Sequence, residues 1–174
     1  LDRIPGIEWI RLLYTYPRYW TDGLLDAFAS CAKLVPYVDM PIQHTDERVL
    51  RRMRRGLDWD GTRTLLGKIR AAAPEMAIRT TVITGFPGET DEEFATLLRD
   101  LEEMAFDNLG AFAYSTEEGT PAGAMADQVP EAVREERRQH VMKLQRTISL
   151  RKNRARIGRT LPVLIDAIDE ERRQ

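Results

Sequence analysis

Residues 77–90 read Ala77-Ile78-Arg79-Thr80-Thr81-Val82-Ile83-Thr84-Gly85-Phe86-Pro87-Gly88-Glu89-Thr90. The first eight are rich in β-branched side chains, which predicts a strand over 77–84. The next five contain two glycines and a proline, which predict a tight turn. Thr90 and Glu93 have the spacing of a capping box, so a helix should follow directly. A strand that leads through a tight turn into a helix is a repeating unit of α/β folds.

The same order of elements extends on both sides of this unit. Apolar and β-branched runs predict three further strands, at residues 9–14, 37–42 and 109–115. Helical patterns separate the strands, at residues 21–34, 47–55, 62–73 and from Asp91 onward. Four alternations of strand and helix predict right-handed crossovers and a mainly parallel sheet. An open sheet and an arc of a barrel both fit this pattern.

A long helix is predicted after the last of these strands, over residues 131–156, and Gly158 should end it. Its apolar stripe consists of Val133, Val141, Leu144 and Ile148. Residues 161–167 then look like the first strand of a second domain. We therefore expect one domain over 1–156 and an incomplete second domain over 157–174. We also expect the chain to be a piece of a longer protein, because Leu1 does not look like a native start.

Composition argues against several classes of protein. The 174 residues include 26 Lys and Arg against 28 Asp and Glu, a net charge of −2, which does not favour a general nucleic-acid binder. No apolar run approaches the roughly 18 residues of a membrane span, so no membrane partner is expected. Cys31 is the single cysteine, so this chain alone forms no disulfide and holds no cysteine-based cluster. A reducing cytoplasm is the expected compartment.

Ligands of parallel α/β folds gather at the carboxyl ends of the strands. The turn over residues 85–89 is one such end, where Gly85 and Gly88 allow close approach of the backbone. It lacks the Gly-Lys-Ser/Thr ending of a phosphate loop, and the carboxylates at the helix start would repel an anion. The alternative is a tight turn whose acidic residues stabilise the helix dipole.

Polar side chains mark the neighbouring strands. Gln43 offers donors and an acceptor after the second strand, and His44 suits proton chemistry, ligand orientation or a structural hydrogen bond. Arg79 and Thr81 share one face of the third strand. An inward Arg79 needs a partner, either a ligand carboxylate or Asp39. The basic runs at 51–55 and 143–159 are predicted to be solvated helix faces, although the second also suits contact with RNA.

Four stretches, taken together and in order, resemble the radical S-adenosylmethionine methylthiotransferases. They are residues 38–44, residues 48–56, residues 81–90, and residues 114–122, which include Glu117-Glu118-Gly119-Thr120-Pro121-Ala122. The subfamily that modifies ribosomal protein S-twelve is the most similar, because the tRNA-modifying relatives have Arg-Pro in place of Glu117-Glu118 and Ser-Gly in place of His44-Thr45. Two carboxylates at that point would oppose a tRNA and suit a basic ribosomal protein.

The resemblance implies the C-terminal part of a partial parallel (β/α) barrel, then a long helix and the first strand of a truncated β-domain called TRAM. It implies that a 4Fe–4S cluster cleaves S-adenosylmethionine reductively, and that the 5′-deoxyadenosyl radical takes hydrogen from the β-carbon of an aspartate. A second 4Fe–4S cluster delivers the methylthio group. The cysteines that bind both clusters are absent from this chain, so it should be inactive alone. Expected partners are ribosomal protein S-twelve, the small ribosomal subunit and an electron donor.

The resemblance also suggests roles for individual residues in binding S-adenosylmethionine. Gln43 and His44 would contact its ribose or amino-acid end, and Arg79, beside Thr81, would pair with its methionyl carboxylate. The remaining candidates are Gly85, Phe86, Gly88 and Glu89 against the cofactor, with Tyr114 and Ser115 beside the adenine. No catalytic residue and no metal ligand is expected in this chain. Two alternatives remain open, a tRNA adenosine methylthiotransferase and a binding module without clusters.

Overall fold

The computed structural model describes residues 1–56, 58–161 and 163. In these residues, three strands and five α-helices follow a short 3-10 helix at Pro17–Tyr19, and strands and helices alternate except where α2 and α3 follow each other between β1 and β2. Their bounds are α1 Asp22–Ser30, β1 Tyr37–Asp39, α2 Glu47–Arg52, α3 Trp59–Ala72, β2 Ala77–Thr84, α4 Asp91–Met104, β3 Asn108–Ala113 and α5 Glu131–Arg154. The described residues contain no helix with both the length and the apolar character needed to cross a membrane.

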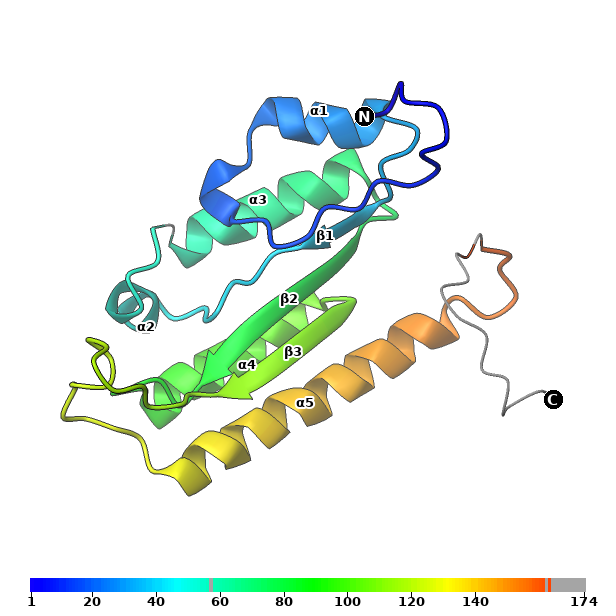
Figure 1. The fold of residues 1–174 in the computed structure, drawn as a ribbon. Helices are drawn as coiled ribbons and strands as arrows, with labels where there is room; N and C mark the ends of the chain where they lie inside the picture. Colours follow the sequence, from blue (N-terminus) through cyan, green and yellow to red (C-terminus); the bar gives the residue numbers. More distant parts are fainter. Residues whose placement is uncertain (57, 162, 164–174) are drawn as a thin grey trace, which may run out of the picture.

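The strands form one parallel sheet in the order β1-β2-β3. All three carboxyl ends point toward the end of the molecule where α2 lies (Figure 1). The α/β class and the parallel sheet predicted from the sequence are therefore confirmed. The capping box is confirmed as well, because the Thr90 side chain accepts the Glu93 N–H and the Glu93 side chain accepts the Thr90 N–H.

The strand predicted at residues 9–14 is wrong. Ile10 forms only an isolated bridge with Leu34, because the partner segment is a loop that follows α1 rather than a strand. The strand predicted at 37–42 is shorter than expected and ends at Asp39. Pro41 has no N–H to continue the ladder, and pairing resumes only at the bridge between Gln43 and Val82.

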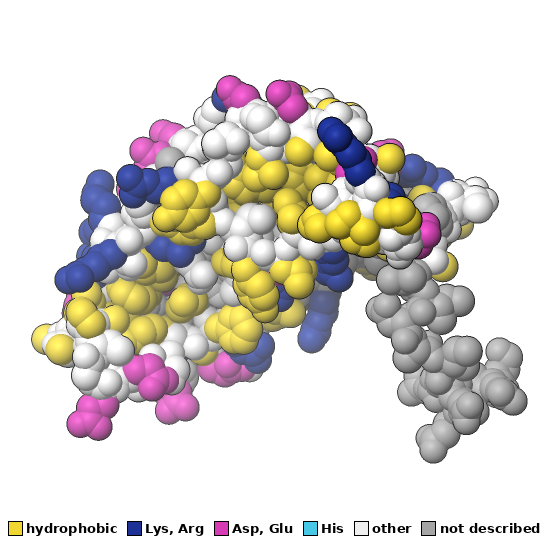
Figure 2. Space-filling model, turned by 45° about the horizontal axis from the view of Figure 1, so that its top comes forward, with side chains coloured by type: hydrophobic (Ala, Val, Ile, Leu, Met, Phe, Trp, Pro, Cys, Tyr) yellow, Lys and Arg dark blue, Asp and Glu magenta, His cyan; other side chains and the backbone are white. Residues whose placement is uncertain are grey.

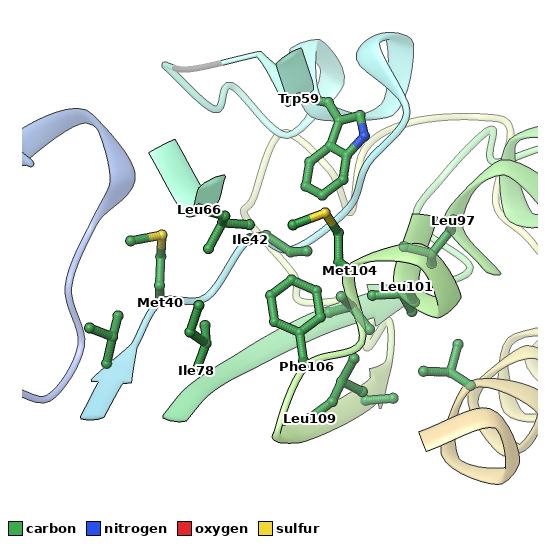
Figure 3. Close-up of a cluster of buried hydrophobic side chains, with 14 of the residues drawn as sticks. Met40, Ile42, Trp59, Leu66, Ile78, Leu97, Leu101, Met104, Phe106 and Leu109 are labelled. Carbon is green, nitrogen blue, oxygen red and sulfur yellow. The ribbon is translucent and has the colours of Figure 1, made fainter. Parts of the chain in front are cut away.

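The central strand β2 matches its prediction in full and explains the core. Its side chains alternate between buried and partly exposed along all eight residues, with Ile78 and Val82 fully buried. They pack against apolar side chains from α3, α4 and the segment before β3, which Figure 3 shows as one continuous cluster. Its members include Met40, Leu66, Ile69, Leu97, Leu101, Met104, Phe106 and Leu109. The opposite face of β2 carries Arg79 and Thr81.

Helix α5 runs beside β3, with its first turns near the strand ends and its last turns at the other end of the sheet (Figure 1). Val141 and Ile148 of the predicted stripe are buried, and Val133 and Leu144 are half-buried. The helix ends two residues before the predicted Arg156. The predicted strand at 161–167 and the division at residue 157 fall mostly outside the described residues.

Candidate functional site

Three loops, one after each strand, meet at the carboxyl end of the sheet. Gln43 joins the loop after β1 to the strand β2. Its N–H donates to Thr81 O, and its carbonyl accepts from the Ile83 N–H, both at 2.9 Å. Gln43 has a φ of 70°, in the left-handed region that is unfavourable for a residue with a side chain. Its side-chain Oε1 is buried and has no hydrogen-bond partner within the described part of the chain. A strained residue with an unpaired buried acceptor is typical of a binding site.

The turn after β2 is closed by its own glutamate. The Glu89 side chain is completely buried, and its Oε2 accepts the Gly85 N–H at 2.9 Å. Its Oε1 accepts from Nη1 of Arg137, 2.7 Å away in α5. Arg137 is itself buried and reaches Asp91 with its other terminal nitrogen. A buried carboxylate with these partners fixes the turn.

His44 completes this buried group. Its ring is fully buried, and Nδ1 accepts the Asp46 N–H at 2.9 Å. Because Nδ1 accepts this hydrogen bond, the ring N–H is on Nε2. Nε2 faces Glu89 Oε2 at 3.5 Å, longer than a good hydrogen bond. His44 and Glu89, both predicted to touch a cofactor, thus face each other in the interior.

Arginines in and just after α2 bind the strand-end loops. The prediction of a solvated basic run at 51–55 is therefore wrong for Arg52 and Arg55. Arg48 donates to Gly88 O and pairs with Glu93. Arg52 donates to Pro87 O and pairs with Asp127, and Arg55 donates to Pro41 O at 2.8 Å. Arg48 and Arg52, at i and i+4, share one face of α2, and that spacing could have revealed their shared role, whereas Arg55 lies beyond the end of the helix.

Arg134, near the start of α5, holds the loop that follows β3. Its Nη1 donates to Tyr114 O at 3.0 Å, and its guanidinium lies 5.2 Å from the Tyr114 ring centroid. Gly85 and Gly88 both have positive φ, and a Cβ at these positions would overlap Arg134 and Asp127 respectively. These glycines therefore allow the protein's own side chains to approach the backbone closely.

Arg79 lies on the face of β2 opposite the helix-packed core. Its Nη1 is 2.9 and 2.7 Å from the two carboxylate oxygens of Asp39, which confirms the partner suggested by the sequence. Asp39 is buried, whereas the Arg79 side chain is 35% exposed. Nη2 of Arg79 has no hydrogen bond within the described residues. Thr81 is half-buried on the same face.

The aromatic residues after β2 and β3 pack together. Phe86 is buried and makes an edge-to-face contact with Tyr114, with ring centroids 5.3 Å apart. The Tyr114 hydroxyl is buried without a partner within the described residues. Ser115 is exposed, and its hydroxyl lies 3.3 Å from Glu117 Oε1. The Tyr114 hydroxyl is therefore available as a hydrogen-bond donor near the strand ends, whereas Ser115 lies at the surface.

The sheet face that carries Arg79 exposes apolar surface. Register pairs Ile83 with Phe112, and Phe112 is 60% exposed. Leu13 and Tyr14, in the segment before β1, are also exposed. Apolar side chains reach the surface in several patches of the face shown in Figure 2. A hollow between β3 and α5 is lined by residues that include Arg79, Gly110, Met142, Arg146 and Leu150.

Ionisable groups around the loops are perturbed. Burial opposes ionisation of Glu93, but hydrogen bonds from Arg48 and from the Thr90 N–H hold the pKa of this carboxyl below its ordinary value. The same hydrogen bond with Glu93 raises the pKa of Arg48 despite some burial. Burial lowers the pKa of Arg55, whose guanidinium also lies over the Tyr16 ring. The shifts of Glu93 and Arg48 reflect the ion pair between them, and the shift of Arg55 reflects burial.

Residues at the strand ends and Arg79, nearer the start of β2, fit an organic ligand but not an iron–sulfur cluster. Gln43 Oε1, the Tyr114 hydroxyl and Nη2 of Arg79 supply an acceptor, a donor and a cation. Such groups match the amine, hydroxyl and carboxylate groups of S-adenosylmethionine. Iron–sulfur clusters need several cysteine thiolates, and the sequence has only Cys31. The described residues contain no group of three or more His, Cys, Asp or Glu side chains placed to hold a metal.

Comparisons with known proteins agree with this geometry. A family profile described as the Radical SAM superfamily matches residues 1–101. Relatives named ribosomal protein uS12 methylthiotransferase RimO are 49% identical in Anaeromyxobacter sp. (strain K), 49% in Heliobacterium modesticaldum and 47% in Syntrophotalea carbinolica. These alignments cover 98%, 95% and 98% of this chain but only 36%, 36% and 38% of the relatives. The chain thus spans just over a third of their length.

A solved structure supports the fold. The radical SAM enzyme coproporphyrinogen III oxidase (HemN) from Escherichia coli superposes with a TM-score of 0.66. The match covers 80% of this chain and 32% of that chain at 22% identity. A likeness at this identity concerns the fold alone. It agrees with an arc of a (β/α) barrel, one of the two arrangements that the strand–helix pattern allowed.

Proposed function

Because this chain belongs to the radical SAM superfamily, we propose that the full-length protein is a methylthiotransferase that modifies an aspartate of ribosomal protein uS12. The observation that supports this proposal most is the 45–49% identity, over nearly the whole chain, to relatives named for that activity. The protein-modifying assignment is favoured over the tRNA alternative, since these relatives are named for a ribosomal protein. The family match disfavours a binding module without clusters.

S-adenosylmethionine is the proposed cofactor, and this chain would form one wall of its site. When bound, the cofactor supplies on one-electron reduction the oxidising power needed to activate an unreactive C–H bond. Gln43 would accept a hydrogen bond from the cofactor through Oε1. Nη2 of Arg79, whose Nη1 is held by Asp39, would pair with the methionyl carboxylate. Thr81 lies next to Arg79 on the same face and would border the amino-acid end.

The loops after β2 and β3 would form the adenosine side of this wall. Backbone groups of residues 85–88 would line the pocket. Phe86 would support the Tyr114 ring by its edge-to-face contact, and the Tyr114 hydroxyl would donate to the nucleoside. Ser115, which is exposed, would lie at the pocket entrance. These groups bind and orient, and the closed loops exclude water from the reacting centre.

Both 4Fe–4S clusters would be held by the part of the protein that lies outside this sequence. The same holds for most of the TRAM domain, which we place after residue 157. An electron donor and the small ribosomal subunit are the further proposed partners, and the cytoplasm is the proposed compartment. Exposed Glu117 and Glu118, in the loop after β3, would favour a basic protein substrate over the phosphate backbone of a tRNA.

The experiment uses full-length protein, purified without oxygen and loaded with iron and sulfide. It is incubated with S-adenosylmethionine, a reductant, and either uS12 or unmodified tRNA, and both products are analysed by mass spectrometry. We expect a methylthio group on one aspartate of uS12 and none on tRNA. Modification of tRNA alone would contradict the protein-modifying assignment. A protein that holds no iron and does not bind S-adenosylmethionine would contradict the proposed chemistry altogether.

A further inference from the structure

We propose that His44 and Glu89 are positioning residues that hold Gln43 and the Gly85 turn in their binding geometry and touch no ligand themselves. This inference rests on the proposed function, because it concerns the same cofactor site. It differs from the sequence-based expectation, which placed both residues among the cofactor contacts. Both side chains are buried, and both lie beside left-handed backbone.

Neither side chain has a surface to offer a ligand. The exposed fraction of both side chains is zero. Both Glu89 oxygens are occupied, Oε1 by Arg137 and Oε2 by the Gly85 N–H. The His44 Nδ1 accepts the Asp46 N–H, and its Nε2, which has no hydrogen-bond partner within the described residues, faces Glu89 Oε2 at 3.5 Å in the interior. A ligand would have to displace one of these partners from the interior to reach either residue.

Their partners are the backbone groups that shape the site. Glu89 fixes Gly85, the left-handed residue that ends β2 and begins the turn. His44 follows Gln43, the left-handed residue that joins the first loop to β2. A left-handed conformation at a residue with a side chain persists only where its surroundings enforce it. The contact between His44 and Glu89 therefore links the unfavourable backbone of Gln43 to the left-handed turn at Gly85, at neighbouring strand ends.

Arg137 connects this pair to α5. Its guanidinium donates to both the carboxylate and the carbonyl oxygen of Glu89, at 2.7 and 3.1 Å. Arg137 of α5 thus contacts Glu89, Glu89 faces His44, and His44 follows Gln43 in the chain. A shift of Glu89 would change where Gln43 Oε1 and the Gly85 backbone lie. Misplacement by about 1 Å is enough to weaken a binding or reacting geometry by large factors.

Two substitutions test this role in the full-length, cluster-loaded protein. Glu89→Gln keeps the size of the side chain but removes its charge from Arg137. His44→Asn retains an acceptor near the position of Nδ1 for the Asp46 N–H and removes the group that faces Glu89. His44→Asn removes no buried charge, so it remains informative if Glu89→Gln does not fold. Gln145→Ala is the matched control, since Gln145 is buried on α5 and binds Phe106 O, away from the strand ends.

The measurements are the melting temperature and the dissociation constants of S-adenosylmethionine, S-adenosylhomocysteine and 5′-methylthioadenosine. We expect both variants to weaken all three ligands by a similar factor of about tenfold, because the whole site shifts rather than one contact. Gln145→Ala should lower the melting temperature by a similar amount and leave the three affinities unchanged.

Three results would overturn the inference. Wild-type affinities in folded His44→Asn or Glu89→Gln would show a structural role without effect on the site. A loss confined to the ligands that carry the amino-acid end would show direct contact. If wild-type protein does not bind S-adenosylmethionine, the proposed function fails and this inference fails with it, so the two failures are distinguishable.

Discussion

Arg79 and Asp39 lie opposite each other on adjacent parallel strands, and one guanidinium nitrogen bridges both carboxylate oxygens at 2.7 and 2.9 Å. Asp39 is 3% exposed, so removal of its partner leaves a buried charge. We expect Arg79→Met to lower the free energy of unfolding by about 2 to 3 kcal/mol. Asp39→Asn should cost less, because a neutral amide is easier to bury. The double variant should be more stable than the sum of the two losses predicts, by about 1 kcal/mol.

Denaturant unfolding of the four proteins measures this coupling, and strictly additive losses would show that the pair does not interact. Dissociation constants for S-adenosylmethionine provide the functional readout. Arg79→Met should raise the dissociation constant about tenfold, which corresponds to about 1.4 kcal/mol. Arg79→Lys keeps the positive charge but loses the forked geometry, so it should recover little affinity. Unchanged affinity in Arg79→Met would remove Arg79 from the proposed site.

The two glycines of the turn after β2 should not tolerate alanine. Gly85 and Gly88 have φ values of 69° and 79°, and an added Cβ would overlap Arg134 and Asp127. Because of strain and overlap together, alanine at either position should lower the free energy of unfolding by about 2 to 4 kcal/mol. Gly119→Ala is the matched control, because its φ of 77° is similar and no atom lies within 4 Å of the new Cβ. It should cost only about 1 kcal/mol. Equal losses at all three positions, measured by thermal unfolding, would mean that the overlap is unimportant.

The ion pair between Arg48 and Glu93 should make stability depend on pH. The folded-state pKa of Glu93 lies below the ordinary value of 4.5, because hydrogen bonds from Arg48 and Thr90 outweigh burial. The stabilisation is therefore complete above about pH 4.5 and is lost as pH falls through the folded-state value. Glu93→Gln should cost about 1 to 2 kcal/mol at pH 7 and progressively less in acid.

Glu135 provides the control for this pH dependence. The exposed Arg138 lowers the pKa of Glu135 to about 2. Both side chains are open to solvent, so Glu135→Gln should change stability very little. Urea unfolding between pH 2.5 and 7 distinguishes the two sites. If the difference in free energy of unfolding between wild type and Glu93→Gln stays constant across this range, the pH dependence does not come from the pair of Arg48 and Glu93.

The parts of the fold that were predictable from sequence are those with a strong local signal. β2 has β-branched residues throughout and alternates in burial along its whole length, and its bounds agree with the prediction. The capping box at Thr90 depends on residues three positions apart, and it is also present. The segment at 9–14 has a similar apolar pattern but pairs only at Ile10, because the ladder depends on a distant partner that is not a strand.

The meeting of the strand-end loops was predictable from the sequence, but the contacts of each side chain were not. Parallel topology brings Gln43, Gly85 and Tyr114 to one end of the sheet, as the element order implied. Sequence alone does not show that Glu89 turns inward to meet Arg137, since that pairing joins residues 48 positions apart. The prediction of a solvated basic run at 51–55 is wrong at Arg52 and Arg55 for the same reason, because their acceptors are carbonyl oxygens of loops distant in the chain.

Gln43 is expected to lower the free energy of unfolding and to raise the affinity for S-adenosylmethionine. Its left-handed backbone is unfavourable by about 1 kcal/mol, and its Oε1 is buried without a partner in the described structure. Gln43→Gly relieves both costs, so the free energy of unfolding should rise by about 1 kcal/mol. The same change removes the proposed acceptor, so the affinity of the full-length protein for S-adenosylmethionine should fall about tenfold.

Ala105→Gly separates these two effects. Ala105 ends α4 with a φ of 47°, so glycine should stabilise it by a similar amount. Ala105 lies at the opposite end of α4 from the loops around Gln43, so its affinity for S-adenosylmethionine should stay at the wild-type value. A stabilised Gln43→Gly protein with wild-type affinity would mean that the unpaired acceptor serves another purpose. A destabilised one would mean that the side chain has a partner in the full-length protein even without the cofactor.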